Sequence, residues 1–96
     1  MKQVFTTEVF DGWFAGLRDV RARVRIQARI DRAALGNFGD CAPVGEGVSE
    51  MRIHCGLGYR VYFLQRGIEV VILLVGGDKS SQSHDIKRAL GLARDL

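Results

Sequence analysis

The most constraining feature of the sequence is a run of three strand-like segments between residues 49 and 76, separated only by short glycine-containing turns. Residues 49–55 and 59–66 alternate apolar and polar side chains, which is typical of strands with one buried face. Residues 68–76 are almost wholly apolar, as expected of a strand covered on both faces. Gly67 alone separates the second segment from the third, which indicates a tight turn. The run therefore predicts an antiparallel meander.

Apolar residues at helical spacing predict three helices around this meander. The further elements that we expect are a strand at residues 2–6, helices at 8–18, 19–35 and 81–95, and a loop at 36–48, which holds four glycines and the only proline. The core positions expected on the second helix are Val20, Val24, Ala28 and Ile30, and those on the first include Phe10, Trp13 and Phe14. The order β-α-α-β-β-β-α predicts one α+β domain over residues 1–96, with an antiparallel sheet packed against an N-terminal helix pair and a C-terminal helix.

Composition favours an ordinary globular protein, because 47% of the 96 residues are hydrophobic and 26% are charged. The longest apolar run, Val70 to Val75, is too short for a bilayer, which needs about 20 residues. The first residues lack the continuous apolar stretch of a signal peptide, so we expect a cytoplasmic protein without membrane association. Cys41 and Cys55 are expected to be thiols there, and no metal-ligand spacing is present.

Arginines are concentrated in the second expected helix. The arginines that recur three or four residues apart are Arg18, Arg21, Arg25, Arg29 and Arg32. At this spacing they form one continuous stripe, which favours an anionic partner such as nucleic acid. A solvated helix face without a partner is the alternative.

The hairpin MRIHCGLGYRVYF, residues 51–63, carries basic residues where a strand surface would usually mix charges. With a three-residue turn at 56–58, the expected partners are Cys55 with Tyr59, His54 with Arg60, and Arg52 with Tyr62. Because side chains alternate between the two faces of a strand, one face then holds Arg52, His54, Arg60 and Tyr62. Opposed Cβ atoms lie about 5 Å apart, so these four side chains form one cluster. Without an acidic partner on this face, the cluster is suited to an anion, and a plain solvent-facing surface is the alternative.

Two further patterns near this hairpin bear on chemistry. His54 and Cys55 are neighbours in a strand and point to opposite faces, so they cannot form a nucleophilic pair. The segment GGDKSS, residues 76–81, lacks P-loop spacing, but its glycines, Lys79 and the following helix N-terminus could receive a phosphate. Alternatively, Ser80 or Ser81 caps the helix and Asp85 offsets its dipole. We expect Lys79 and His84 to lie near the basic cluster.

The chain resembles the RelE/ParE superfamily of type II toxin–antitoxin toxins, and within it the HigB-type addiction module killer proteins. The segments that carry the resemblance are GNFGDCAPVGEGVSEMRIHCGLGYRVYF and ILLVGGDKSSQSHDI. In the first, a loop is followed by E-M-R-I and G-Y-R-V, which is a hallmark of the family. The resemblance extends over nearly the whole chain, and it implies the fold order given above.

The resemblance also implies an activity, which is ribosome-dependent cleavage of mRNA without metal or cofactor, by attack of a 2′-OH on the adjacent phosphate. The catalytic candidates are His54 as general base, Arg60 as phosphate contact, and Lys79 and His84 as further basic or acidic groups. The implied RNA contacts are Arg52, Tyr62 and the arginine stripe. The implied partners are mRNA, the ribosome, and a helix-turn-helix antitoxin encoded in the adjacent gene. The toxin would contact operator DNA only indirectly, through this antitoxin. The alternatives are a ParE-like gyrase inhibitor and a non-catalytic RNA- or protein-binding module.

Overall fold

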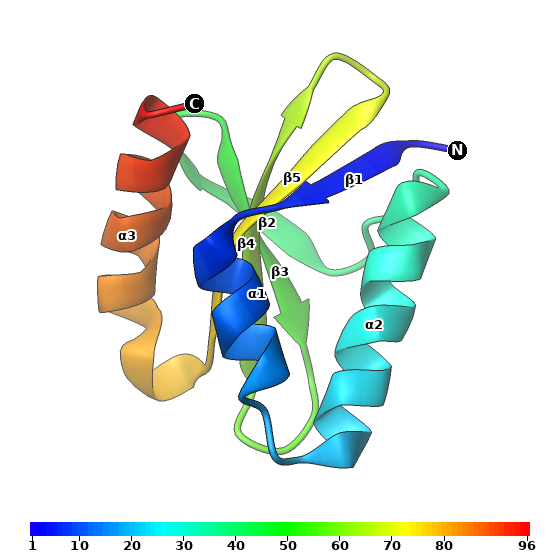
Figure 1. The fold of residues 1–96 in the computed structure, drawn as a ribbon, viewed down its shortest axis with the longest axis vertical. Coiled ribbons are helices and arrows are strands. Elements are labelled where there is room, and N and C mark those ends of the chain that lie inside the picture. Colours follow the sequence, from blue (N-terminus) through cyan, green and yellow to red (C-terminus); the bar gives the residue numbers. More distant parts are fainter.

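A five-stranded mixed sheet forms the centre of the molecule, which a computed structural model describes for residues 1–96 (Figure 1). The strands are β1 (Gln3–Thr6), β2 (Cys41–Gly45), β3 (Val48–Ile53), β4 (Tyr59–Arg66) and β5 (Val70–Gly77). The helices are α1 (Glu8–Ala15), α2 (Val20–Ala34) and α3 (Gln82–Arg94), the last preceded by the 3₁₀ turn η1 (Lys79–Ser81). The expected α+β class is confirmed, and no helix has both the length and the hydropathy to cross a membrane.

The strand order is β1-β5-β4-β3-β2, and the first pair differs from the others. β1 pairs with β5 in parallel, whereas β2 to β5 form an antiparallel meander. A parallel pair needs a long crossover connection, and here α1, α2 and the meander together supply it. The prediction of a wholly antiparallel sheet was therefore wrong at this edge.

Two connections differ from the sequence-based expectation. Residues 36–48 do not form a continuous loop, because β2 lies within them and pairs with β3. Pro43 and the glycines concealed this strand, and the proline is tolerated because β2 is an edge strand with a register shift between Pro43 and Gly45. The turn between β4 and β5 is also longer than Gly67 alone, since β5 begins only at Val70.

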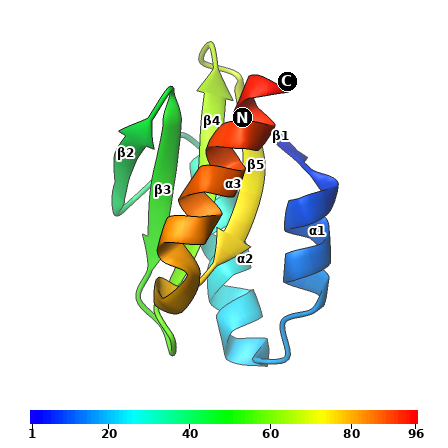
Figure 2. The same ribbon diagram turned by 90° about the vertical axis from the view of Figure 1, so that its left-hand side faces the viewer.

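Helices cover both faces of the sheet, with α2 and α3 on opposite sides (Figure 2). The larger core joins Ala22, Ile26 and Ile30 of α2 to the sheet, with Phe10 of α1 buried beside them. Trp13 and Phe14 pack against the same core, so the aromatic stripe of α1 is a core stripe, as expected. The smaller core joins α3 to the other face, where Tyr62 is buried.

The buried side of α2 is not the one that the sequence indicated. Ile30 is buried as expected, but Val20 and Val24 are 68% and 63% exposed. The residues that α2 buries are Ala22, Ile26, Ile30 and Ala33. Asp19 caps the helix by accepting a hydrogen bond from the Ala22 backbone N–H at 3.2 Å. Two valines thus remain on the outer side of a helix that is otherwise mostly polar there.

Candidate functional site

The pairing of β3 with β4 sets the position of every candidate residue on this hairpin. Ile53 pairs with Tyr59, Arg52 with Arg60, and Glu50 with Tyr62. The predicted register was wrong by two residues, because the connection spans residues 54–58 and not a three-residue turn. A shift of two preserves the face of each side chain, so Arg52 and Arg60 still share a face. His54, however, lies outside the strand.

Helix α3 covers the face that was expected to be open. Tyr62 has no exposed surface, so the prediction that it contacts RNA was wrong. The Arg60 side chain is only 12% exposed, and its Nε is buried without a hydrogen-bond partner. Sequence alternation could not reveal this, because the apolar side of α3 packs on the same strands from a distant part of the chain.

A buried carboxylate lies among these side chains, which corrects the expectation that the face has no acidic partner. Glu50 is 1% exposed and accepts hydrogen bonds from Tyr62 Oη at 2.9 Å, Gln82 Nε2 at 2.8 Å and Arg52 Nε at 3.1 Å. Arg60 Nη1 lies 3.8 Å from Glu50 Oε1. Arg52 and Arg60, which were expected to bind an external anion, therefore already share the Glu50 carboxylate.

The ionisation of Glu50 reflects these partners. Burial by itself raises the pKa of Glu50, but hydrogen bonds from Gln82, Tyr62 and Arg52, with the charge of Arg60, outweigh it and hold the pKa below its ordinary value. Burial and the bond to Glu50 raise the pKa of Tyr62. Glu50 is thus an anion and Tyr62 a neutral donor near neutral pH.

Glu50→Gln should flatten the acid side of the pH–stability curve. A depressed pKa stabilises the folded state above the unfolded pKa of about 4.3, and this contribution is lost as pH falls through the lower folded value. We also expect a loss of about 1–3 kcal/mol at pH 7, because the new amide faces donors. Urea unfolding between about pH 3 and 7 measures both effects. The exposed Glu69→Gln is the control, and an unchanged slope in Glu50→Gln contradicts the prediction.

His54 pairs with a residue that the sequence did not identify. Its Nε2 lies 2.6 Å from Asp40 Oδ2, and Asp40 Oδ1 lies 3.5 Å from Arg52 Nη1. The bond to His54 holds the pKa of Asp40 below its ordinary value, and the charges of Arg52 and Arg29 act in the same direction against the effect of burial. The imidazole remains 71% exposed. Asp40 lies fourteen positions before His54 in a glycine-containing segment, and no spacing rule connects the two.

Arg29 fixes the segment that carries Asp40. Its Nη1 donates to the Arg52 carbonyl oxygen at 2.6 Å, and its Nη2 donates to the carbonyls of Phe38 at 3.0 Å and Asp40 at 3.3 Å. Gly39 permits this approach, since a Cβ there would lie 2.8 Å from Arg29 Nη2. Arg29 therefore has a structural role that the sequence did not indicate.

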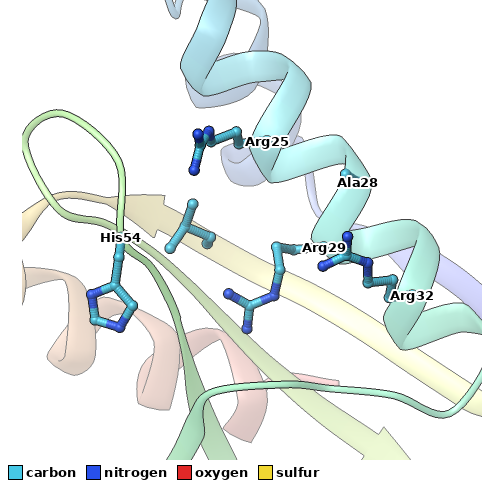
Figure 3. Close-up of a pocket in the computed structure, with 6 residues that line it drawn as sticks. Arg25, Ala28, Arg29, Arg32 and His54 are labelled. Carbon is cyan, nitrogen blue, oxygen red and sulfur yellow. The ribbon is translucent and has the colours of Figure 1, made fainter.

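A cavity of about 420 Å³ lies between α2 and the end of β3 (Figure 3). It is lined by Arg25, Ala28, Arg29, Arg32, Ile53 and His54. Figure 3 shows the guanidinium groups extending from the helix into the space before the strand, with the His54 imidazole beyond them. Arg18 and Arg21 are exposed but do not line this cavity. The stripe thus contributes three of its five arginines to one concave, positively charged site that includes a histidine.

The GGDKSS segment has no open phosphate cradle. A Cβ at Gly76 would overlap the Trp13 indole, and one at Gly77 would overlap the Asp85 carboxylate, so these side chains already occupy the space above the glycines. Capping is the role observed, and Asp78 caps the 3₁₀ turn η1 by accepting a hydrogen bond from the Ser80 backbone N–H at 2.8 Å. Ser81, one of the two residues proposed as the cap, occupies the N-cap position of α3, but its side chain makes no capping hydrogen bond and donates to Asp85 instead.

Lys79 and His84 lie in different surroundings. Lys79 lies against the β3–β4 turn, since a Cβ at Gly58 would be 2.8 Å from its Cε. His84 is exposed on α3, makes no side-chain hydrogen bond and does not line the cavity that contains His54. No cluster of three or more His, Cys, Asp or Glu side chains has an arrangement that could hold a metal ion.

The geometry defines an α+β protein with a basic cavity and an adjoining His–Asp pair. No known family profile matches the chain. An uncharacterized protein of Haemophilus influenzae strain Rd is 50% identical to it over 94 residues, which cover 98% of this chain and 95% of that protein. The chain belongs to the same family as this protein.

Proposed function

We propose that this protein is the toxin of a type II toxin–antitoxin system, a HigB-like member of the RelE/ParE superfamily that cleaves mRNA on the ribosome. The observation that carries the proposal is the pairing of His54 with Asp40 beside a cavity lined by Arg25 and Arg32. Strand cleavage needs an acid–base group and cations at one phosphate, and this place offers both. The element order supports it, differing from the order that the resemblance implies only by the added edge strand β2.

In this proposal His54 is the general base. Ionised Asp40 accepts the Nε2 proton of the imidazole, so Nδ1 is the nitrogen left to take the proton of a ribose 2′-OH. The 2′-oxygen attacks the adjacent phosphorus, the bond to the 5′-oxygen breaks, and the leaving oxygen takes a proton. A 2′,3′-cyclic phosphate and a 5′-OH result. Lys79, beside the same turn, is the candidate donor of that proton.

In this proposal, the arginines that stabilise the charge on the reacting phosphate differ from the one that the resemblance implies. Arg60 is 12% exposed and lies beside Glu50, so we assign the phosphate contact to Arg25 and Arg32, whose side chains line the cavity. Arg52 binds both Glu50 and Asp40, which makes it a positioning residue. Exposed Arg18 and Arg21 extend the basic surface toward ribosomal RNA, whose phosphates attract such side chains.

The proposal includes the biological setting that the resemblance implies. The toxin acts in the cytoplasm on translated mRNA and is neutralised by a helix-turn-helix antitoxin from the adjacent gene. Any contact with operator DNA is made by the antitoxin.

Expression of the chain alone tests the proposal directly. We expect growth arrest, together with primer-extension stops inside translated codons that vanish when translation is blocked. Arrest with intact mRNA contradicts the nuclease proposal. Gyrase–DNA cleavage complexes in the same cells would support the ParE-like alternative.

Asp40→Asn should reduce cleavage by roughly tenfold or more, because His54 loses the ionised acceptor that orients it. Asp40→Glu should restore part of the activity, since it returns the carboxylate. The measurement is the initial rate of cleavage at equal protein concentration, with thermal unfolding as the check on folding. Asp95→Asn, an exposed change at the far end of α3, is the matched control. Full activity in Asp40→Asn would remove the positioning role.

A further inference from the structure

A second surface of α2 lies outside the cavity that contains His54. A hollow of about 280 Å³, which we call the α2 groove, is lined by Phe14, Val20, Arg23, Val24 and Gln27. We propose that the α2 groove binds an acidic amphipathic helix of a partner protein. The inference does not depend on nuclease activity, because no residue of the groove lines the cavity with His54.

The apolar part of the groove has no partner within the chain. Val20 and Val24 are 68% and 63% exposed, although α2 has a separate, fully formed buried side. They are four residues apart and therefore form one ridge on the outer side of the helix. Phe14, partly buried at the end of α1, adds an aromatic surface next to them. Together they form an apolar strip that a second helix could cover.

The charges around this strip specify the partner. The Arg23 guanidinium lies 5.6 Å from the centroid of the Phe14 ring, at one side of the groove. Arg21, which does not line the cavity with His54, is exposed three positions before Val24. The only acidic residue within α2 is Asp31. A partner with an apolar stripe flanked by Glu or Asp would bury the valines and pair with these arginines.

Other occupants fit these features less well. A second copy of this chain would bring the same arginines to the interface, and like charges placed together are unfavourable. A nucleic acid would pair its phosphates with the arginines but would gain little affinity from two valines, since its affinity comes mainly from phosphate contacts. A helix suits the surface, because its side chains at i, i+3, i+4 and i+7 can pack beside the Val20–Val24 ridge.

Three synthetic peptides of about 18 residues test the proposal. The first has a leucine stripe at helical spacing and glutamates elsewhere, the second replaces the glutamates with lysines, and the third scrambles the first. Fluorescence anisotropy should show that the protein binds the first roughly tenfold more tightly than the others. Binding should weaken as NaCl rises from about 0.05 to 0.3 M, because exposed charges are screened.

Variants of the protein locate the binding site. The double substitution Val20→Glu with Val24→Glu should weaken binding of the acidic peptide by roughly tenfold or more, and Val20→Ala with Val24→Ala should weaken it less. Ile68→Glu is the matched control, because Ile68 is 81% exposed and lies in the β4–β5 turn. No binding, equal binding of the scrambled peptide, or full binding by the Val20→Glu, Val24→Glu protein would overturn the proposal.

Discussion

His54→Ala should lower the rate of mRNA cleavage by about 10²- to 10⁴-fold, the contribution typical of a positioned general base. The imidazole is 71% exposed and bonds through one nitrogen to Asp40, so its removal leaves the core untouched. We therefore expect a change in unfolding free energy within about 1 kcal/mol. The measurement is single-turnover cleavage of a translated message, with folding monitored separately.

The chain offers a matched control for this experiment. His84 is the other of its two histidines, is also exposed, and lies on α3 without a side-chain hydrogen bond. His84→Ala should cleave at nearly the wild-type rate, because the structure places it outside the cavity. If His84→Ala loses activity and His54→Ala keeps it, the general base is on α3 and the assignment made from the cavity is wrong.

Gly76→Ala should cause a large loss of stability. The new Cβ would lie well inside contact distance of the Trp13 ring, which packs against β5 from α1. Overpacking of this kind costs about 3 kcal/mol, and the melting temperature of a domain of this size should fall by roughly 10 °C or more. Thermal unfolding followed by circular dichroism measures the change.

Two companion variants show whether the clash is the cause. Gly91→Ala adds the same methyl group inside α3, where no atom lies within 4 Å, so it should stabilise the protein by about 0.5–1 kcal/mol. In a Trp13→Ala background, Gly76→Ala should cost much less than in the wild type, because the indole is gone. Equal costs in both backgrounds would show that Trp13 does not restrict this position.

Much of the fold was predictable because its signals are local. Apolar residues at helical spacing indicated α1, α2 and α3, and alternation indicated β3 and β4. The error on α2 arose because Val20 and Val24 are as apolar as the residues that α2 buries, and periodicity alone cannot choose between two apolar sides. β2 was missed because proline and glycine dominate it, although an edge strand tolerates both.

The candidate site was predictable only in part. The arginine spacing correctly placed Arg25, Arg29 and Arg32 on one side of a helix, but His54, which was predicted within a strand, lies just after the end of β3. It could not show that Arg29 binds three carbonyl groups or that Arg60 lies beside Glu50 under α3. These contacts join different elements of the fold, which the spacing within one helix or strand does not relate.

The sequence by itself determined which side chains share a face, because that depends only on the period of a strand or helix. The tertiary structure alone decided which of these side chains are exposed to a ligand and which are buried or paired within the protein. The register of β3 against β4 and the cover of α3 place Glu50 beside Arg52 and Arg60, and the anchored segment places Asp40 beside His54. The Glu50–Arg52 contact follows from the strand period, because the two residues are two positions apart on β3, but the other neighbours come from other elements and no local pattern records them.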